Sequence, residues 1–319
     1  MDPVIPLADL QPIYSVADVG RALEDGAARR NEGLKSWYER MHELGGSRYI
    51  IKPSTAAAVD ELYQASPNFG EVLDDLRKFL ALALSGNEAV QFTPMLLLGE
   101  PGLGKTYFAK RLAHVLGTGF EFVSMSSLTA GWVLTGASAQ WHNARPGKVA
   151  QTLIEGEYAN PVVVLDEVDK AGGDARYDPM GALYSLLEPD TAAHFKDEFI
   201  DVDMDASHIL WVATANDESS IPEPIRNRMN IYAIERPDAE GSRRIALAVY
   251  REILDAHRWP FPTDPSESVI DCLAAVPPRD MRKLLLDAFG TARLAERDYL
   301  VPADIDAKKL CGRRARLGF

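Results

Sequence analysis

The stretch Gly99-Glu100-Pro101-Gly102-Leu103-Gly104-Lys105-Thr106 decides the fold of this chain. An apolar run at 95–98 comes directly before it, and a segment in which Phe108, Leu112 and Val115 share one helical face comes directly after it. A glycine-rich loop between a strand and a helix is the context in which this spacing binds phosphate groups. Its glycines let backbone N–H groups wrap around the phosphates, and the helix N-terminus adds the positive end of its dipole. The alternative, a glycine turn that merely links a strand to a helix, is disfavoured because both flanks also match.

The polar residues of this loop predict ATP and Mg²⁺ as cofactors. Lys105 supplies a positive charge to the β and γ phosphate oxygens, and the hydroxyl of Thr106 can ligate Mg²⁺. We therefore expect all residues of 99–106 to contact the nucleotide, and we add Tyr107, which follows them along the helix.

Two carboxylates follow another apolar run, at 162–165, and complete the predicted hydrolytic site. Adjacent residues point in different directions, so Asp166 is the candidate for Mg²⁺ coordination and Glu167 for orienting and deprotonating the attacking water. Alone, such a pair is often only a solvated strand end, but the loop at 99–106 strengthens the prediction. Asn216 follows the apolar run at 209–213 and could hold the water or the γ-phosphate; its alternative is a turn residue.

The apolar pattern predicts an α/β fold, with a parallel sheet sandwiched by helices, a small all-helical lid after it and a helical N-terminal leader. Continuous apolar runs suit strands that are buried on both faces. They lie at 95–98, 120–123, 162–165 and 209–213. We expect three segments, with bounds 1–68, 69–236 and 237–319. In the first, a helical stripe is formed by Leu34, Trp37, Tyr38, Met41 and Leu44.

Composition limits the classes of partner. The net charge of -13 disfavours a protein that holds nucleic acid through a cationic surface, and the basic tail from Lys308 to Arg316 is better explained as a solvated terminus. The two cysteines, Cys272 and Cys311, do not form a disulfide framework, which fits a reducing cytoplasm. No apolar run approaches the roughly 20 residues of a membrane-spanning helix.

Several further motifs resemble the AAA+ ATPase module of the Lon protease family. The resemblance covers about 69 to 300 and implies a P-loop AAA+ fold with a helical lid, assembly into a homo-oligomeric ring, a hexamer, and a protein substrate. The matching motifs lie at 160–170 (Asn160 to Lys170), 178–179 (Asp178-Pro179), 186–190 (Leu186 to Asp190), 214–216 (Thr214 to Asn216) and 221–224 (Ile221 to Pro224).

By this resemblance, arginines and an asparagine complete the site. Asn216 is similar to the sensor-1 residue, and Arg228 to the arginine finger that reaches the γ-phosphate of a neighbouring subunit. Asn227 stands where the family usually has Asp, so Arg226 is a rival for the finger. Arg279 resembles the sensor-2 arginine of the lid; its alternative is a surface arginine on an amphipathic helix.

The segment from Gly136 to Lys148 resembles the first pore loop of the family, with Trp141 as the substrate-gripping aromatic. The alternative is a tryptophan that anchors a loop to the core. His142 beside it is counted with the pore, although a solvated neighbour is the simpler interpretation. A second pore loop is expected at 172–177. Phe69 resembles the adenine-contacting position, with simple core packing as its alternative.

These residues predict an ATPase that unfolds, threads or remodels proteins, as a chaperone or with a separately encoded peptidase. The chain ends at Phe319 without a counterpart of the Ser-Lys dyad, so we expect no peptidase activity of its own. The alternative is a nucleotide-dependent switch or loader on a partner complex, nucleic-acid machinery included, without polypeptide threading. A scaffold without ATPase activity is disfavoured because Lys105, Thr106, Asp166, Glu167 and Asn216 are chemically competent.

Overall fold

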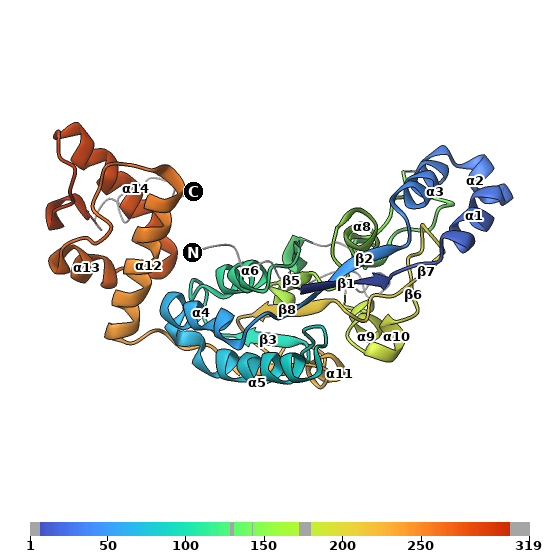
Figure 1. The fold of residues 1–319 in the computed structure, drawn as a ribbon, viewed down its shortest axis with the longest axis horizontal. Helices are drawn as coiled ribbons and strands as arrows, with labels where there is room; N and C mark the ends of the chain where they lie inside the picture. The colour runs from blue at the N-terminus through green and yellow to red at the C-terminus, as the bar shows by residue number, and fades with distance from the viewer. Residues whose placement is uncertain (1–6, 128–130, 142, 172–179, 307–319) are drawn as a thin grey trace. The chain divides into compact units, whose positions relative to one another are not determined.

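The centre of the fold is a five-stranded parallel sheet with strand order β4-β5-β8-β3-β9 (Figure 1). The computed structural model describes residues 7–127, 131–141, 143–171 and 180–306. All four predicted strands are confirmed, and β9 is an additional edge strand. The strands are β3 (Met95–Leu98), β4 (Phe120–Ser124), β5 (Val162–Asp166), β8 (Leu210–Ala215) and β9 (Asn230–Ala233).

The inner strands owe their position to uninterrupted apolar sequence. The side chains of Val162, Val164 and Leu165 in β5 are fully buried, as are those of Leu96 and Leu97 in β3. A strand that buries both faces needs cover on both sides, which explains why helices follow and precede each strand. One of them, α5 (Gly70–Gly86), runs beside β3 (Figure 1).

The register of the sheet gathers the chemically active loops at one edge. In the parallel pairing, Leu98 of β3 lies opposite Ala215 of β8, and Leu165 of β5 lies opposite Ala213 of β8. The N–H of Gly99 donates a hydrogen bond to the carbonyl of Ala215, 3.1 Å away. The chain therefore leaves β3, β5 and β8 at the same, carboxyl edge, which is where ligands bind in open parallel sheets.

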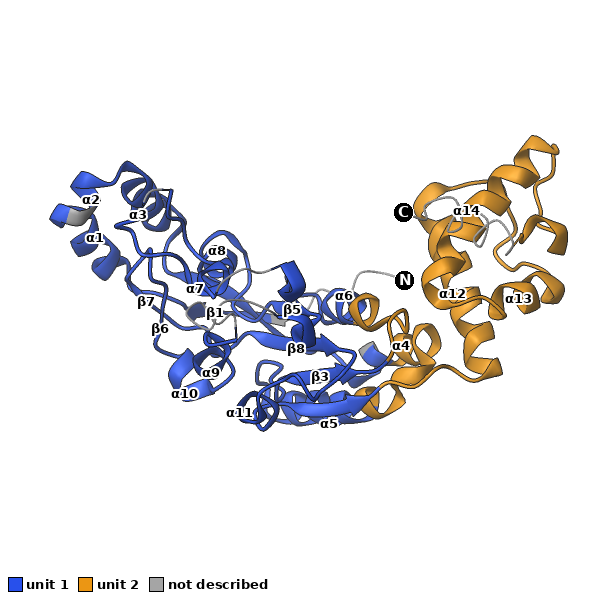
Figure 2. Cartoon of the chain, turned by 180° about the vertical axis from the view of Figure 1, so that it is seen from behind, with its two compact units in different colours: residues 1–59, 74–99, 109–233 blue, residues 60–73, 100–108, 234–319 orange. Residues whose placement is uncertain are grey.

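The chain divides into two compact units, each assembled from segments that are far apart in sequence (Figure 2). The first unit comprises residues 1–59, 74–99 and 109–233 and contains the sheet. The second comprises residues 60–73, 100–108 and 234–319, and therefore includes most of the glycine-rich loop. The three-segment division expected from the sequence stays a prediction.

The predicted N-terminal helices are present, but they are accompanied by two strands that the sequence analysis did not include. Strand β1 (Leu7–Pro12) pairs antiparallel with β2 (Ser47–Lys52). Between them, α3 (Glu32–Leu44) buries Leu34, Tyr38 and Met41 of the expected stripe, whereas Leu44 is exposed. Gly45, with φ of 72°, ends this helix in a conformation that favours glycine and lets the chain return as β2.

The second unit is mostly helical and has its own core. Its main helices are α12 (Ala239–His257), α13 (Glu267–Ala274) and α14 (Pro278–Leu294). Tyr250 of α12 and Phe289 of α14 are fully buried, with ring centroids 5.3 Å apart. Helix α4 (Asp60–Ala65) packs against α12. The helical spacing expected after residue 236 is therefore confirmed.

The remaining helices and strands are short, apart from α1, α6 and α8. They are α1 (Val16–Glu24), α2 (Gly26–Arg30), α6 (Lys105–Leu116), α7 (Trp132–Thr135), α8 (Lys148–Glu155), α9 (Leu183–Leu186), α10 (Pro189–Ala192), α11 (Glu223–Arg226), β6 (Phe195–Lys196) and β7 (Asp203–Met204). The Asp178-Pro179 motif lies outside the described residues, and buried Met180 and α9 follow it. In the described part of the chain, every helix is too short or too polar to cross a membrane.

Candidate functional site

The glycine-rich loop after β3 adopts a backbone that only glycine tolerates easily. Gly102 and Gly104 both have φ of 89°, in the left-handed region, so their lack of a Cβ is required by the loop itself. The N–H of Phe108 donates to the carbonyl of Gly104, 2.8 Å away, so helical bonding begins at once after the loop. Lys105, the first residue of α6, is 8% exposed, and its Nζ donates to the carbonyl of Glu100 at 3.0 Å. The loop thus curls around its own lysine.

Two polar residues that the sequence analysis did not single out support this loop within the second unit. The guanidinium of Arg236 donates through Nε and Nη2 to one carboxylate oxygen of Glu100, at 2.9 and 2.6 Å. The side-chain amide of Asn68 donates to the carbonyls of Leu103 and Glu235, at 3.4 and 3.2 Å. These contacts fix the outer side of the loop, and they depend on residues too distant in sequence to be recognised by spacing.

Arg279 reaches the same loop from the N-terminal turn of α14. A Cβ placed on Gly102 would lie 3.0 Å from Cδ of Arg279, so this glycine also makes room for the arginine. The Nε of Arg279 is 3.7 Å from a carboxylate oxygen of Asp280, and the arginine side chain is exposed. The guanidinium therefore lies where it can meet a phosphate held by the loop, although its sensor-2 role stays a prediction.

Phe69 and Tyr107, the other two expected nucleotide contacts, already have partners in the protein. Phe69 is 2% exposed and stacks on Phe108, with ring centroids 4.3 Å apart and an angle of 4° between the rings. This arrangement is the core packing that the sequence left open as an alternative, and the adenine contact stays a prediction. The hydroxyl of Tyr107 donates to Glu252 of α12, 2.5 Å away.

A buried threonine organises the acidic end of β5. Oγ1 of Thr214 donates to Oδ1 of Asp166 at 2.8 Å and accepts a hydrogen bond from the N–H of Glu167 at 3.0 Å. Glu167 has φ of 57° and ψ of 50°, a left-handed conformation that costs a non-glycine residue roughly 1–2 kcal/mol. Thr214 therefore holds both acids, and it keeps Glu167 in a strained backbone conformation. The carboxylate of Glu167 also pairs with Lys170, which raises the pKa of the lysine.

Asp169 holds the backbone in place at the end of β8, as Thr214 does at the end of β5. Its Oδ2 accepts hydrogen bonds from the N–H groups of Asn216 and Asp217, at 3.1 and 3.3 Å. Its other oxygen is buried and makes no hydrogen bond to the described residues. The turn that carries Asn216 is thus fixed by a residue that lies two positions after Glu167. The sequence offered one signal for this role, namely a third acid two positions after the Asp-Glu pair.

Both arginines proposed as the finger lie after β8 and are partly buried. Arg228 is held more closely: its Nη1 donates to the carbonyl of Pro224 at 2.7 Å, and its Nε lies 3.2 Å from a carboxylate oxygen of Glu188. The nearest carboxylate oxygen of Glu218 is 3.9 Å from Nη1 of Arg226. The choice between them stays a prediction, because the finger acts on a neighbouring subunit.

Trp141 is exposed on a loop whose two ends lie against a single carboxylate. Oδ2 of Asp197 accepts a hydrogen bond from the N–H of Gly147 at 2.8 Å, and a Cβ on Gly136, which has φ of 81°, would collide with the same carboxylate. Trp141 is 52% exposed and packs edge to face against Trp132, with centroids 5.6 Å apart at 82°. His142 and the expected second pore loop at 172–177 lie outside the described residues.

Burial raises the pKa of Asp197 to about 6, because its side chain has no exposed surface. Three backbone N–H groups, of Gly147, Phe199 and Ile200, oppose this shift by hydrogen bonding to the charged form, at 2.8, 2.9 and 3.1 Å. The loop with Trp141 therefore depends on a carboxyl group that titrates within two pH units of neutrality.

The N-terminal helices also contact this loop. The amide nitrogen of Asn31 donates to the carbonyl of Ala139 at 3.0 Å, while its oxygen caps α3 by accepting from the N–H of Leu34 at 3.1 Å. The hydroxyl of Tyr38 donates at 2.7 Å to the carbonyl of Ile200, whose own N–H group donates to Asp197. The predicted leader is thus part of the support of the tryptophan loop, which its helical pattern alone could not indicate.

Comparisons with known proteins agree with these motifs. The profile of the family described as "ATPase family associated with various cellular activities (AAA)" matches residues 95–235. Lon protease 2 of Hydrogenovibrio crunogenus is 32% identical over 228 residues, which are 71% of this chain and 25% of that protein. The mitochondrial Lon protease homolog of Rattus norvegicus is 38% identical over 148 residues, 46% of this chain and 16% of that protein. The chain thus spans a quarter or less of the length of these two relatives.

Solved structures show the same fold at lower sequence identity. The closed state of Hsp104 with ATPγS and FITC casein matches with a TM-score of 0.61 at 18% identity, over 75% of this chain and 48% of that one. The extended S. cerevisiae Hsp104:casein complex matches with a TM-score of 0.61 at 17% identity, over 80% of this chain and 50% of that one. At such identities the likeness shows the fold alone.

Proposed function

Because residues 95–235 match the profile of the AAA family of ATPases and the chain is similar to Lon proteases, we propose that this protein hydrolyses ATP in order to remodel protein substrates. The observation that carries the hydrolytic part is the network at the end of β5. There, Thr214 holds Asp166 and the backbone of Glu167 at the edge of the sheet where the glycine-rich loop begins.

The residues of the chain fit a nucleotide and a magnesium ion. Gly102 and Gly104 have positive φ values and no side chains, so the backbone N–H groups of the loop can approach a phosphate closely. Thr106 and Asp166 offer the hydroxyl and carboxylate oxygens that Mg²⁺ prefers. When bound, magnesium ATP supplies the phosphoryl bond that is cleaved and neutralises part of its charge.

The protein supplies the remaining functions. Lys105 places a positive charge on the phosphate oxygens, and Glu167 accepts the proton of the attacking water. Asn216, fixed by Asp169, orients that water without adding charge. Arg228 stabilises the charge that develops on a neighbouring subunit's phosphate, so the site is complete only in an assembly, for which we propose a hexameric ring.

The proposal that the protein remodels other proteins rests on Trp141. An aromatic ring that is exposed on an anchored loop can grip an extended polypeptide by packing that tolerates many sequences. The Lon relatives are named as proteases, which act on polypeptides, and this supports a protein substrate here. The net charge of -13 disfavours the alternative of a loader on nucleic acid.

Substitution of Glu167→Gln tests the hydrolytic assignment. Removal of a general base lowers turnover by about 100-fold or more, while ATP binding by the loop is kept. Steady-state ATPase assays and equilibrium binding of a fluorescent ATP analogue measure the two effects. Glu223→Gln, at an exposed position in α11, is the control for loss of a negative charge. Unchanged turnover in Glu167→Gln would rule out Glu167 as the base.

The two candidate functions are separated by the ligand that stimulates hydrolysis. A remodeller is stimulated by an unfolded protein, for example casein, and this stimulation requires Trp141. A loader on nucleic acid is stimulated by DNA with a strong dependence on salt, and substitution of Trp141→Ala leaves that stimulation unchanged.

A further inference from the structure

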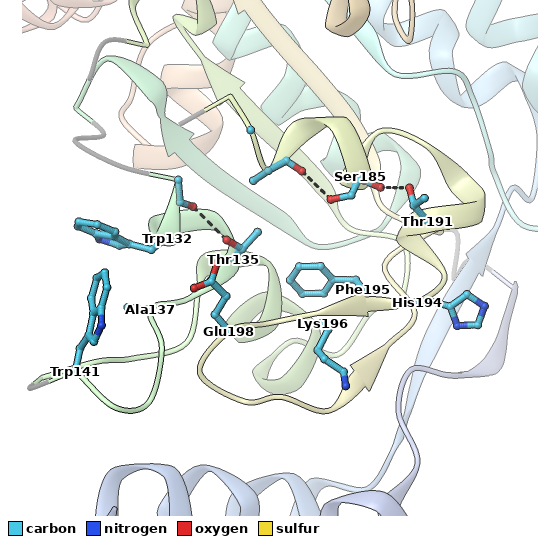
Figure 3. A pocket seen from close by; sticks show the side chains of 13 residues that line it. Trp132, Thr135, Ala137, Trp141, Ser185, Thr191, His194, Phe195, Lys196 and Glu198 are labelled. Carbon is cyan, nitrogen blue, oxygen red and sulfur yellow. Dashed lines mark hydrogen bonds between the residues drawn. The ribbon is translucent and has the colours of Figure 1, made fainter. Parts of the chain in front are cut away.

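A cavity of about 470 Å³ opens beside Trp141 in the first unit (Figure 3). Its wall is formed by the loop of Trp141, by α7, by the residues around α9 and by β6. Figure 3 shows the rings of Trp132 and Trp141 next to each other at one side of the cavity. The ring of Phe195 is directed toward them from the other side. The volume is in the range of sites that hold a small organic group.

The hydroxyl groups of the cavity are already used within the protein. Oγ of Ser185 donates to the carbonyl of Ala182 at 3.2 Å, and Oγ1 of Thr191 donates to the carbonyl of Ser185 at 2.6 Å. Oγ1 of Thr135 donates weakly to the carbonyl of Gly131, 3.5 Å away. A ligand would therefore find few hydroxyl protons to bind, and a ligand that needs many hydrogen bonds would lose them on entry.

The charged groups of the cavity disfavour an anionic ligand, because the exposed Glu198 adds a carboxylate to the lining. Nζ of Lys196 lies 3.4 and 3.6 Å from carboxylate oxygens of Asp201 and Asp203, which raise the pKa of the lysine. Its positive charge is thus neutralised by its own hairpin. His194 is exposed, and Figure 3 shows its ring directed away from the two tryptophans. The rings of Trp132, Trp141 and Phe195 give the cavity aromatic surface beside its polar groups.

We propose that this cavity is a subsite for one large apolar or aromatic side chain of the polypeptide that Trp141 holds. Trp132 forms its inner wall and determines the preference for such side chains. The edge-to-face pair of Trp132 and Trp141 presents ring faces and edges, with which a third ring packs favourably. This inference rests on the proposed function, since it concerns the same polypeptide.

The test compares two unstructured fluorescein-labelled peptides of glycine, serine and threonine. One carries a central phenylalanine and the other a central serine, and fluorescence anisotropy measures their binding to the full chain with a non-hydrolysable ATP analogue. We expect the phenylalanine peptide to bind about tenfold more tightly, as burial of one aromatic group against rings allows. Trp132→Ala should remove this preference and leave the affinity for the serine peptide unchanged.

Two further variants keep the test informative. Trp132→Phe preserves an aromatic wall and should keep most of the preference. Trp259→Phe, in the other unit against Phe289, removes a tryptophan without touching the cavity and should behave as the unaltered chain. Circular dichroism and basal ATPase activity confirm folding for each variant.

The outcomes distinguish the subsite from the proposed function. Equal binding of both peptides to the unaltered chain, or an equal loss of both in Trp132→Ala, would overturn the subsite and leave the remodelling function in place. A failure of any polypeptide to bind or to stimulate hydrolysis, with ATPase activity intact, would instead overturn the remodelling function and the subsite with it.

Discussion

At the scale of single residues, Thr214 is a position where one side chain serves two functional acids. Thr214→Val keeps the shape of the side chain but leaves the N–H of Glu167 without its acceptor and Asp166 without a donor. We expect a loss of about 1–3 kcal/mol in the free energy of unfolding. Because Glu167 then leaves its strained conformation, kcat should fall more than the affinity for ATP.

Urea unfolding and steady-state kinetics measure these two effects of Thr214→Val. Thr214→Ser is the matched control, because it keeps the hydroxyl and should restore most of the turnover. Equal turnover in the valine and serine variants would mean that the hydroxyl does not hold the acids in place.

The sequence was sufficient to find the acids but not what holds them. Asp166 and Glu167 follow an apolar run, and that pattern is local. Thr214 and Asp169 matter only because the register of β5 against β8 brings residues nearly fifty positions apart into hydrogen-bonding distance. Phe69, which the resemblance places near adenine, stacks on Phe108, and no local pattern distinguishes a nucleotide contact from core packing.

At the scale of elements, the tryptophan loop depends on the buried carboxyl group of Asp197. The pKa of this group is about 6 in the folded chain, against 3.8 as its ordinary value, so the folded state holds the proton more firmly than the unfolded state. Stability is therefore lost as pH rises from about 4 to 6, by up to about 3 kcal/mol.

Asp197→Asn cannot titrate and should remove this loss. Urea unfolding at pH 4.5 and pH 7 measures the effect. The free energy of unfolding of the unaltered chain, minus that of the variant, should be smaller at pH 7 than at pH 4.5. Asp197→Ala, which leaves three N–H groups without an acceptor, should be destabilised at both pH values. A pH-independent difference between the unaltered chain and Asp197→Asn would contradict the raised pKa.

Elements with a strong local pattern were predicted well, and those without one were not. Helices α3 and α5 and the apolar strands have stripes or runs that identify them. Strands β1 and β2 were missed because their burial depends on distant partners. The N–H of Tyr49 in β2 donates to the carbonyl of Glu157, and the carbonyl of Tyr49 accepts from the N–H of Ala159. Such pairing has no counterpart in the sequence of β2 itself.

At the scale of the whole molecule, the proposed assembly makes Arg228 part of a neighbour's site. Arg228→Ala should bind ATP normally and hydrolyse it at least about 1,000-fold more slowly, as expected for an arginine that acts in trans. A mixture of Arg228→Ala with Glu167→Gln should regain activity, because some interfaces then combine an intact glutamate with an intact arginine.

ATPase assays of the mixture, and of each variant alone, measure this complementation. Arg226→Ala is the matched control and should keep most of its activity if Arg228 is the finger. A mixture that stays as inactive as its components would mean that Arg228 acts within its own chain or only stabilises it through Glu188.

The closeness of Gly136 and Gly147 to Asp197 has a consequence for engineering. One buried carboxylate lies against both ends of the segment 136–147 and accepts a hydrogen bond from the N–H of Gly147. Libraries that vary the exposed position Trp141, with Gly136, Gly147 and Asp197 held constant, would therefore test which substrates the loop selects while its two ends stay in place. Neither glycine would tolerate replacement, because a side chain at Gly136 meets Asp197 and one at Gly147 meets the carbonyl of Leu134.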